Sequence, residues 1–116
     1  YVAGPIGALD EGRPARIRAA IDAGATLLRA GLAPFVPHLW AAAMQDHEVS
    51  ADALAGYEHW MAYDFEWLST CAAVLRLPGD SPGADREVEA ALNAGKPVFY
   101  STSGIIAHFG GSNVPA

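Results

Sequence analysis

The chain alternates short apolar runs with longer segments in which apolar residues recur every three or four positions. A short apolar run bounded by turn residues is typical of a buried strand. Four runs have this character: YVAG at residues 1–4, APFVP at 33–37, AAVLRLP at 72–78 and KPVFYS at 96–101. The pattern therefore predicts four strands, and the second is expected to deliver His38 into the loop that follows it.

The segments between these runs have helical spacing. The first predicted helix begins at Pro14, a favourable first-turn residue, and stops at Gly31. Ile17, Ile21, Gly24 and Leu28 fall at helical spacing along it. A second helix is predicted over 50–70, with Ser50 as a candidate N-cap and a stripe formed by Leu54, Tyr57, Met61, Asp64 and Leu68. A third is predicted over 84–93, with shorter helical segments at HLWAAAM (38–44) and SGIIAHFG (103–110).

Strands that alternate with helices in this way pair in parallel and are joined by right-handed crossovers. The sequence thus predicts an α/β fold, a three-layer α/β/α sandwich of the Rossmann or flavodoxin-like kind, with a mainly parallel sheet of four to five strands. With 116 residues, 52% of them apolar, the chain is expected to form a single domain over 1–116. The residues from about 102 are expected to be a loosely attached tail.

Acidic side chains outnumber basic ones by 13 to 7, which gives a net charge of −6. Proteins that grip a nucleic-acid backbone carry the opposite balance, so we expect a small ligand and no nucleic-acid polymer. The one cysteine, Cys71, cannot form an intrachain disulfide, and no apolar run approaches the ~20 residues of a membrane span. We therefore expect a cytoplasmic protein that does not bind membranes.

In an open parallel sheet, ligands bind beyond the carboxyl ends of the strands. This rule favours the loop after the first predicted strand, His38 and Trp40 after the second, and residues 79–87 after the third. Ser81 and Gly83 precede a helix N-terminus, where free N–H groups favour an anion such as a phosphate. The alternative is a tight turn with an ordinary helix cap.

Two carboxylates stand out against their surroundings. Glu87 lies one turn inside the helix over 84–93, where a carboxylate is also favoured by the helix dipole alone. Asp64 interrupts an apolar stripe, so it must be paired or face a cleft. The strand after that helix leads to the Glu87 loop, so the two acids can converge, and paired acids are the groups that cleave glycosidic bonds. Arg76, inside LRLPG, is predicted to pair with a nearby carboxylate.

Metal binding is not expected, because the spacings between His38, His47 and His59 match no metal-ligand motif.

Four segments together resemble a known family. These segments are YVAGPIG, PFVPHLW, WMAYDFEWLSTCAAVLRLPG and SPGADREVEAALNAGKPVFYS. They resemble the nucleoside 2-deoxyribosyltransferase-like superfamily, and most closely its small members of the DUF4406 type. The similarity spans about residues 1–101. Relatives in that superfamily include nucleoside 2-deoxyribosyltransferases, 2′-deoxynucleoside 5′-phosphate N-hydrolases and CMP N-glycosidases.

The resemblance implies roles for individual residues. The family's Gly-x-x-x-Glu falls on Gly83 and Glu87, which implies that Glu87 is the nucleophile on C1′ of the sugar. The family's Asp before Glu-Trp-Leu falls on Asp64, which implies that Asp64 holds the sugar and manages protons on the departing base. The resemblance also implies contacts of Tyr1 and Gly4 with the substrate, and it implies that Pro5 and Ile6 line the base pocket. It places His38 beside the substrate and Ser81 at a phosphate.

The expected function is therefore cleavage of the N-glycosidic bond of a nucleoside or nucleoside 5′-monophosphate, by hydrolysis or base exchange and without a cofactor. The resemblance also implies a homodimer or a larger homo-oligomer. Asp85 places a second negative charge close to Ser81 and Gly83, so the need for a 5′-phosphate stays open. The alternative function is a non-catalytic nucleotide-binding or sensing module, because a fold alone does not confer activity. A third reading, an NAD-cleaving enzyme, lacks any mark of a dinucleotide site.

Overall fold

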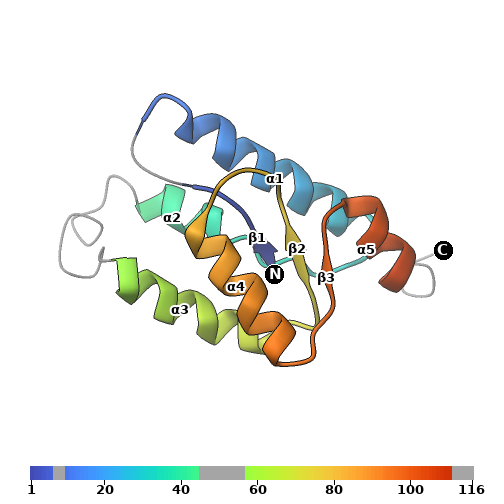
Figure 1. Cartoon of the computed structure of the whole chain (residues 1–116). Coiled ribbons are helices and arrows are strands. Elements are labelled where there is room, and N and C mark those ends of the chain that lie inside the picture. The colour runs from blue at the N-terminus through green and yellow to red at the C-terminus, as the bar shows by residue number, and fades with distance from the viewer. Residues whose placement is uncertain (7–9, 45–56, 111–116) are drawn as a thin grey trace.

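Three short parallel strands lie at the centre of the computed structural model, which describes residues 1–6, 10–44 and 57–110 (Figure 1). The strands are β1 (Val2–Ala3), β2 (Val74–Arg76) and β3 (Val98–Phe99), and their order in the sheet is β1-β2-β3. Val2 is opposite Leu75, and Val74 is opposite Val98. The carboxyl ends of all three strands therefore lie at the same edge of the sheet.

Five helices surround these strands within the described residues. They are α1 (Arg13–Arg29), α2 (Pro37–Met44), α3 (Tyr57–Thr70), α4 (Pro82–Asn93) and α5 (Thr102–Phe109). Prolines at the start of α1 and α4 supply the fixed φ that a first helical turn needs. Ser81 and Ser101 cap α4 and α5 by accepting hydrogen bonds from backbone N–H groups. The predicted helices at 14–31, 84–93 and 103–110 are thus confirmed to within a few residues.

The apolar residues form two clusters, one on each face of the sheet. Val2 and Leu75 pack with residues of α1 and α5. Ala3 and Val74 pack on the other face with residues of α3 and α4, which lie side by side (Figure 1). Because successive residues of a strand point to opposite faces, these two-residue and three-residue strands serve both clusters. The fold is α/β, with helices on both faces of a small parallel sheet.

The expected sheet of four to five strands is larger than the sheet that the structure shows. The described residues contain three strands, and residues 33–37 form none of them. The backbone N–H of Val2 donates to the carbonyl of Phe35 at 2.9 Å, but Pro34 and Pro37 have no N–H to extend a ladder. Pro37 instead begins α2, so His38 lies in the first turn of a helix and not in a loop. The predicted helical turn at HLWAAAM is confirmed.

The expectation of a loose tail from about residue 102 is wrong for the part that the structure describes. Ile105 of α5 is buried with the residues of α1, and Ile106 and Phe109 pack against the same cluster. These apolar side chains recur along one face of a capped helix, which is why the segment packs against the core. Predictions made for His47, Ser50, Leu54 and residues 111–116 lie outside the described residues.

Across residues 1–6, 10–44 and 57–110, no helix is both long and apolar enough to cross a membrane.

Candidate functional site

The structure brings together Tyr1, Asp64 and Glu87. Glu87 lies in the second turn of α4, where the spacing of Ala84, Glu87 and Ala91 puts all three on the buried face. The Tyr1 hydroxyl, just before β1, donates a hydrogen bond to Oε2 of Glu87. Glu87 is only 5% exposed, so its carboxylate is enclosed by protein. Asp64 of α3 lies on the same side, partly buried, and its charge acts on both other groups.

Burial changes the proton affinity of all three groups. Burial raises the pKa of Glu87 to about 7, while the hydrogen bond from Tyr1 lowers it and the charge of Asp64 raises it. Burial raises the pKa of Asp64 to about 6, which the Tyr1 hydroxyl partly offsets. Burial, followed by the charges of the two carboxylates, raises the pKa of Tyr1. Near neutral pH the two acids therefore compete for protons, and Tyr1 stays a hydrogen-bond donor.

An aromatic stack supports this site from one side. The Tyr1 ring stacks on Phe35 with 5.7 Å between centroids, and Phe35 stacks on Trp67 of α3 at 5.0 Å. The sequence did not identify Phe35 as part of the site, and the only signal was its place in an apolar run between prolines. The stack fixes the ring that carries the hydroxyl, and so it fixes the donor to Glu87.

The loops after β1 and β2 lie against each other. A Cβ on Gly4 would be 3.0 Å from Cβ of Leu77, and a Cβ on Gly79 would be 2.9 Å from Cγ of Pro5. Gly79 also has a φ of +114°, a conformation that L side chains rarely adopt. The predicted site residues Gly4 and Pro5 therefore contact the turn that leads into α4. Ile6, also predicted, accepts a hydrogen bond through its carbonyl from Nε of Arg16 at 2.7 Å.

His38 lies beneath this pair of loops. It is 3% exposed, and Nε2 lies 3.1 Å from the Gly4 carbonyl, so Nε2 must carry the proton and donate. Burial lowers the pKa of His38, which favours the neutral ring. Its Nδ1 is then a buried acceptor, and it has no hydrogen-bond partner among the described residues.

Ser81, Gly83 and Trp40 do not join the carboxylates. The Ser81 Oγ accepts a hydrogen bond from the Ala84 N–H at 3.1 Å, which is an N-cap. Gly83 lies in the first turn of α4, and Trp40 on α2 is 46% exposed. Gly83 precedes Glu87 by one turn of α4 and has no side chain to bring to the carboxylates.

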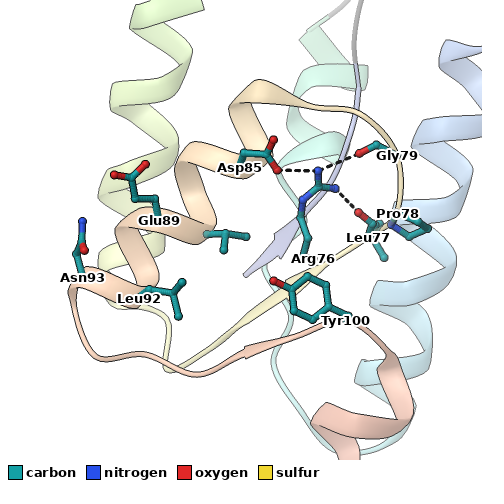
Figure 2. A pocket seen from close by; sticks show the side chains of 10 residues that line it. Arg76, Leu77, Pro78, Gly79, Asp85, Glu89, Leu92, Asn93 and Tyr100 are labelled. Carbon is teal, nitrogen blue, oxygen red and sulfur yellow. Dashed lines mark hydrogen bonds and ion pairs between the residues drawn. The ribbon is translucent and has the colours of Figure 1, made fainter.

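A surface cavity of about 600 Å³ lies on a different face of α4 (Figure 2). Leu92 of α4 and Tyr100, just after β3, stand on two sides of it, and Arg76 of β2 reaches across to Asp85. Tyr1, Asp64 and Glu87 do not line this cavity. The predicted ion pair of Arg76 is confirmed, because its Nη2 lies 3.1 Å from Oδ1 of Asp85. That pairing also compensates the charge of Asp85, which the sequence suggested would oppose a phosphate.

In residues 1–6, 10–44 and 57–110, no three His, Cys, Asp or Glu side chains are grouped so that they could hold a metal ion.

Residues 1–103 match the family DUF1937, which is described as a domain of unknown function. No curated protein matches the chain.

Proposed function

The chain belongs to the DUF1937 family, and from the geometry of its buried carboxylates we propose that it cleaves the N-glycosidic bond of a nucleoside or a nucleoside 5′-monophosphate. The observation that carries the proposal is the hydrogen bond from the Tyr1 hydroxyl to the buried Glu87 carboxylate, with Asp64 close enough to perturb both. The net charge of −6 supports a small substrate over a nucleic-acid polymer.

The proposed reaction uses Glu87 as the nucleophile. Its carboxylate oxygen forms a bond to C1′ of the sugar while the bond from C1′ to the base nitrogen breaks, and the base leaves with that electron pair. Asp64, in its protonated form, donates a proton to the departing base. Water, or the nitrogen of a second base, then attacks C1′ and releases Glu87, while the Asp64 carboxylate takes up the proton that the attacking group loses. The same intermediate therefore leads to hydrolysis or to base exchange.

The protonation states support this division of roles. The pKa values of about 7 for Glu87 and about 6 for Asp64 lie close together, so the pair loses its protons as one unit. The Tyr1 hydroxyl donates to Glu87, and a hydrogen bond of that direction favours the negative charge on Glu87. Near neutral pH the pair therefore holds one proton that the two carboxyls share, so an ionised carboxylate and a proton donor are present together.

A second candidate function is a non-catalytic nucleotide-binding module. The observation that favours it is the enclosure of Glu87, which is 5% exposed, while the cavity of about 600 Å³ lies on another face of α4. In this case the carboxylates would be a buried structural network, and the ligand would bind without being cleaved.

One assay separates the two functions. The purified protein is incubated with nucleosides, deoxynucleosides and their 5′-monophosphates, with and without acceptor bases, and free or exchanged base is measured by chromatography. We expect base release that falls by about 10³-fold or more in Glu87→Gln, because the nucleophile is lost. Glu66→Gln, an exposed glutamate on α3, is the matched control and should keep the wild-type rate.

Two results would reject the enzymatic proposal. One is thermal stabilisation by a nucleotide with no base released by the wild type across the whole panel. The other is release that survives unchanged in Glu87→Gln, which would mean that another group or a contaminant does the chemistry.

A further inference from the structure

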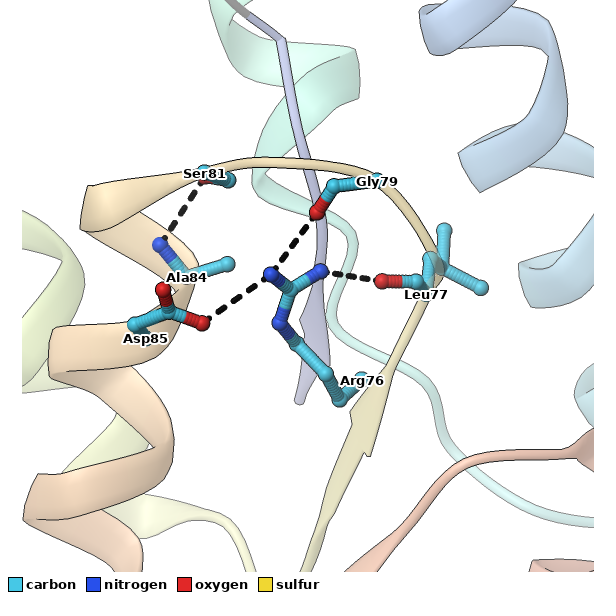
Figure 3. Close-up of polar contacts among 6 residues, drawn as sticks. All are labelled: Arg76, Leu77, Gly79, Ser81, Ala84 and Asp85. Carbon is cyan, nitrogen blue, oxygen red and sulfur yellow. Dashed lines mark hydrogen bonds and ion pairs between the residues drawn. The ribbon is translucent and has the colours of Figure 1, made fainter.

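Arg76 connects three parts of the structure that lead to Glu87 (Figure 3). It is the last residue of β2, and its side chain is only 10% exposed. Nη1 donates to the Leu77 carbonyl, and Nη2 donates to the Gly79 carbonyl at 2.9 Å and to Oδ1 of Asp85 at 3.1 Å. One guanidinium therefore joins the end of β2, the turn after it and the first turn of α4.

The segment that Arg76 holds is also supported by other contacts, among them the burial of Ala84 with Val74. Gly79 packs against Pro5, which fixes the outer side of the turn to the loop after β1. Ser81 caps α4 from within the same segment. The hydrogen bonds of Arg76 add a polar connection from this segment to the end of β2. A planar guanidinium can satisfy several acceptors at once in fixed directions, which an ammonium group cannot do.

We propose that Arg76 is a positioning residue for Glu87, because it anchors the first turn of α4 to the end of β2 and thereby sets where the Glu87 carboxylate lies. Glu87 follows Asp85 by half a turn of the same helix, so any displacement of Asp85 moves it too. The kinetic consequence of this inference rests on the proposed function, whereas its structural consequence does not.

The charged groups around Glu87 give this inference a second readout. Tyr1 approaches it with a hydroxyl, Asp64 lies nearby on α3 and Arg76 on β2. The positive charge of Arg76 lowers the pKa of Glu87, whereas Asp64 raises it. Asp85, on the exposed side of α4, neutralises part of the Arg76 charge.

Three variants separate the charge of Arg76 from its geometry. Arg76→Gln removes the charge, so the pKa of Glu87 should rise by about half a unit or more. Asp85→Asn leaves the charge of Arg76 uncompensated, so the pKa of Glu87 should fall. Arg76→Lys keeps the positive charge but loses the planar guanidinium with its several donors, so the pKa of Glu87 should stay near the wild-type value. Arg29→Gln, which removes an exposed arginine at the end of α1, is the control and should leave it unchanged.

The pKa of Glu87 is measured by NMR titration of the glutamate side-chain carboxyl carbons, with Glu87→Gln used to assign the signal. This measurement needs no substrate. Thermal unfolding by circular dichroism shows which variants fold, and Asp85→Asn and Arg76→Lys keep the test decisive if Arg76→Gln does not fold.

Turnover supplies the second readout. For Arg76→Lys we expect kcat for base release to fall by about tenfold or more, because the Glu87 carboxylate is displaced. The pKa of Glu87 should change little, because the positive charge at position 76 is kept. If the wild type releases no base, the proposed function fails, while the NMR titration still decides whether Arg76 acts on Glu87.

The inference is overturned if Arg76→Gln and Asp85→Asn shift the pKa of Glu87 in the same direction or leave it unchanged. It is also overturned if Arg76→Lys retains the wild-type kcat in an active enzyme, since the guanidinium geometry would then be dispensable.

Discussion

Two of the three carboxylates on helix α4, Asp85 and Glu87, lie half a turn apart and have opposite environments. Glu87 is 5% exposed and receives a hydrogen bond from Tyr1, and burial raises its pKa to about 7. The side chain of Asp85 is 72% exposed and pairs with Arg76. The residues differ by one methylene group, so their chemistry is set by the face of the helix that each occupies.

The ion pair on the exposed side of α4 and the carboxylate on its buried side have different energetic consequences. An exposed ion pair contributes little free energy, but the Arg76 to Asp85 pair is joined to two backbone carbonyls and so fixes local geometry. A buried carboxylate costs stability and is retained where its altered proton affinity is useful. Under the proposed function, the exposed side of α4 orients the helix and the buried side presents the reactive group.

The sharpest test of this contrast is the pH dependence of stability. Because the folded-state pKa of Glu87 lies above its ordinary value, its contribution to stability is complete below about pH 4 and is lost as the pH rises through about 7. Glu87→Gln cannot ionise, so relative to the wild type it should gain roughly 2 kcal/mol between about pH 5 and about pH 8. Urea unfolding followed by tryptophan fluorescence measures this gain.

Asp85→Asn is the matched control in the same experiment. Its carboxylate is exposed, so the difference in unfolding free energy from the wild type should change with pH much less than for Glu87→Gln, and only as far as the pKa of Glu87 is shifted. Equal slopes for the two variants would mean that Glu87 and Asp85 do not differ in environment, and the contrast would be wrong.

Tyr1→Phe gives a smaller effect that is confined to the buried side. Removal of the hydroxyl takes away the hydrogen bond that lowers the pKa of Glu87, so this pKa should rise above about 7. Base release at neutral pH should fall by about tenfold, since a smaller fraction of Glu87 is ionised, and should recover in part at higher pH. The pH profile of kcat measures both changes. A uniform loss at every pH would show that Tyr1 acts by another route.

The sequence predicted the elements that carry the candidate site because their signals are local. Asp64 interrupts an apolar stripe whose described members Met61 and Leu68 are buried, and Arg76 has the carboxylate partner that its position inside an apolar strand demanded. The approach of Asp64 and Glu87 also followed from chain order, since the strand after α3 leads into α4.

Other features depend on contacts between segments far apart in the chain, so the sequence could not supply them. An apolar run at 33–37 has the composition of a strand, but its prolines prevent a ladder and one of them begins α2. The hydrogen bond from the Tyr1 hydroxyl to Glu87, 86 residues away, is one such contact, and the substrate contact expected of Tyr1 stays a prediction. Ile105 of α5 is buried against α1, a contact that a short helix near the C-terminus does not reveal by itself.

The smallest expected effect concerns Ser81, which caps α4 and so serves both faces of the helix equally. Ser81→Ala leaves the Ala84 N–H without its acceptor and should lower the unfolding free energy by about 1 kcal/mol, whereas Ser81→Gly should cost only a few tenths. Because a cap acts on the backbone and not on a buried charge, this loss should be the same at about pH 5 and about pH 8. Urea unfolding at the two pH values measures it. A loss that grows with pH would instead connect Ser81 to the ionisation of Glu87, and the division between the two faces of α4 would have to include its first turn.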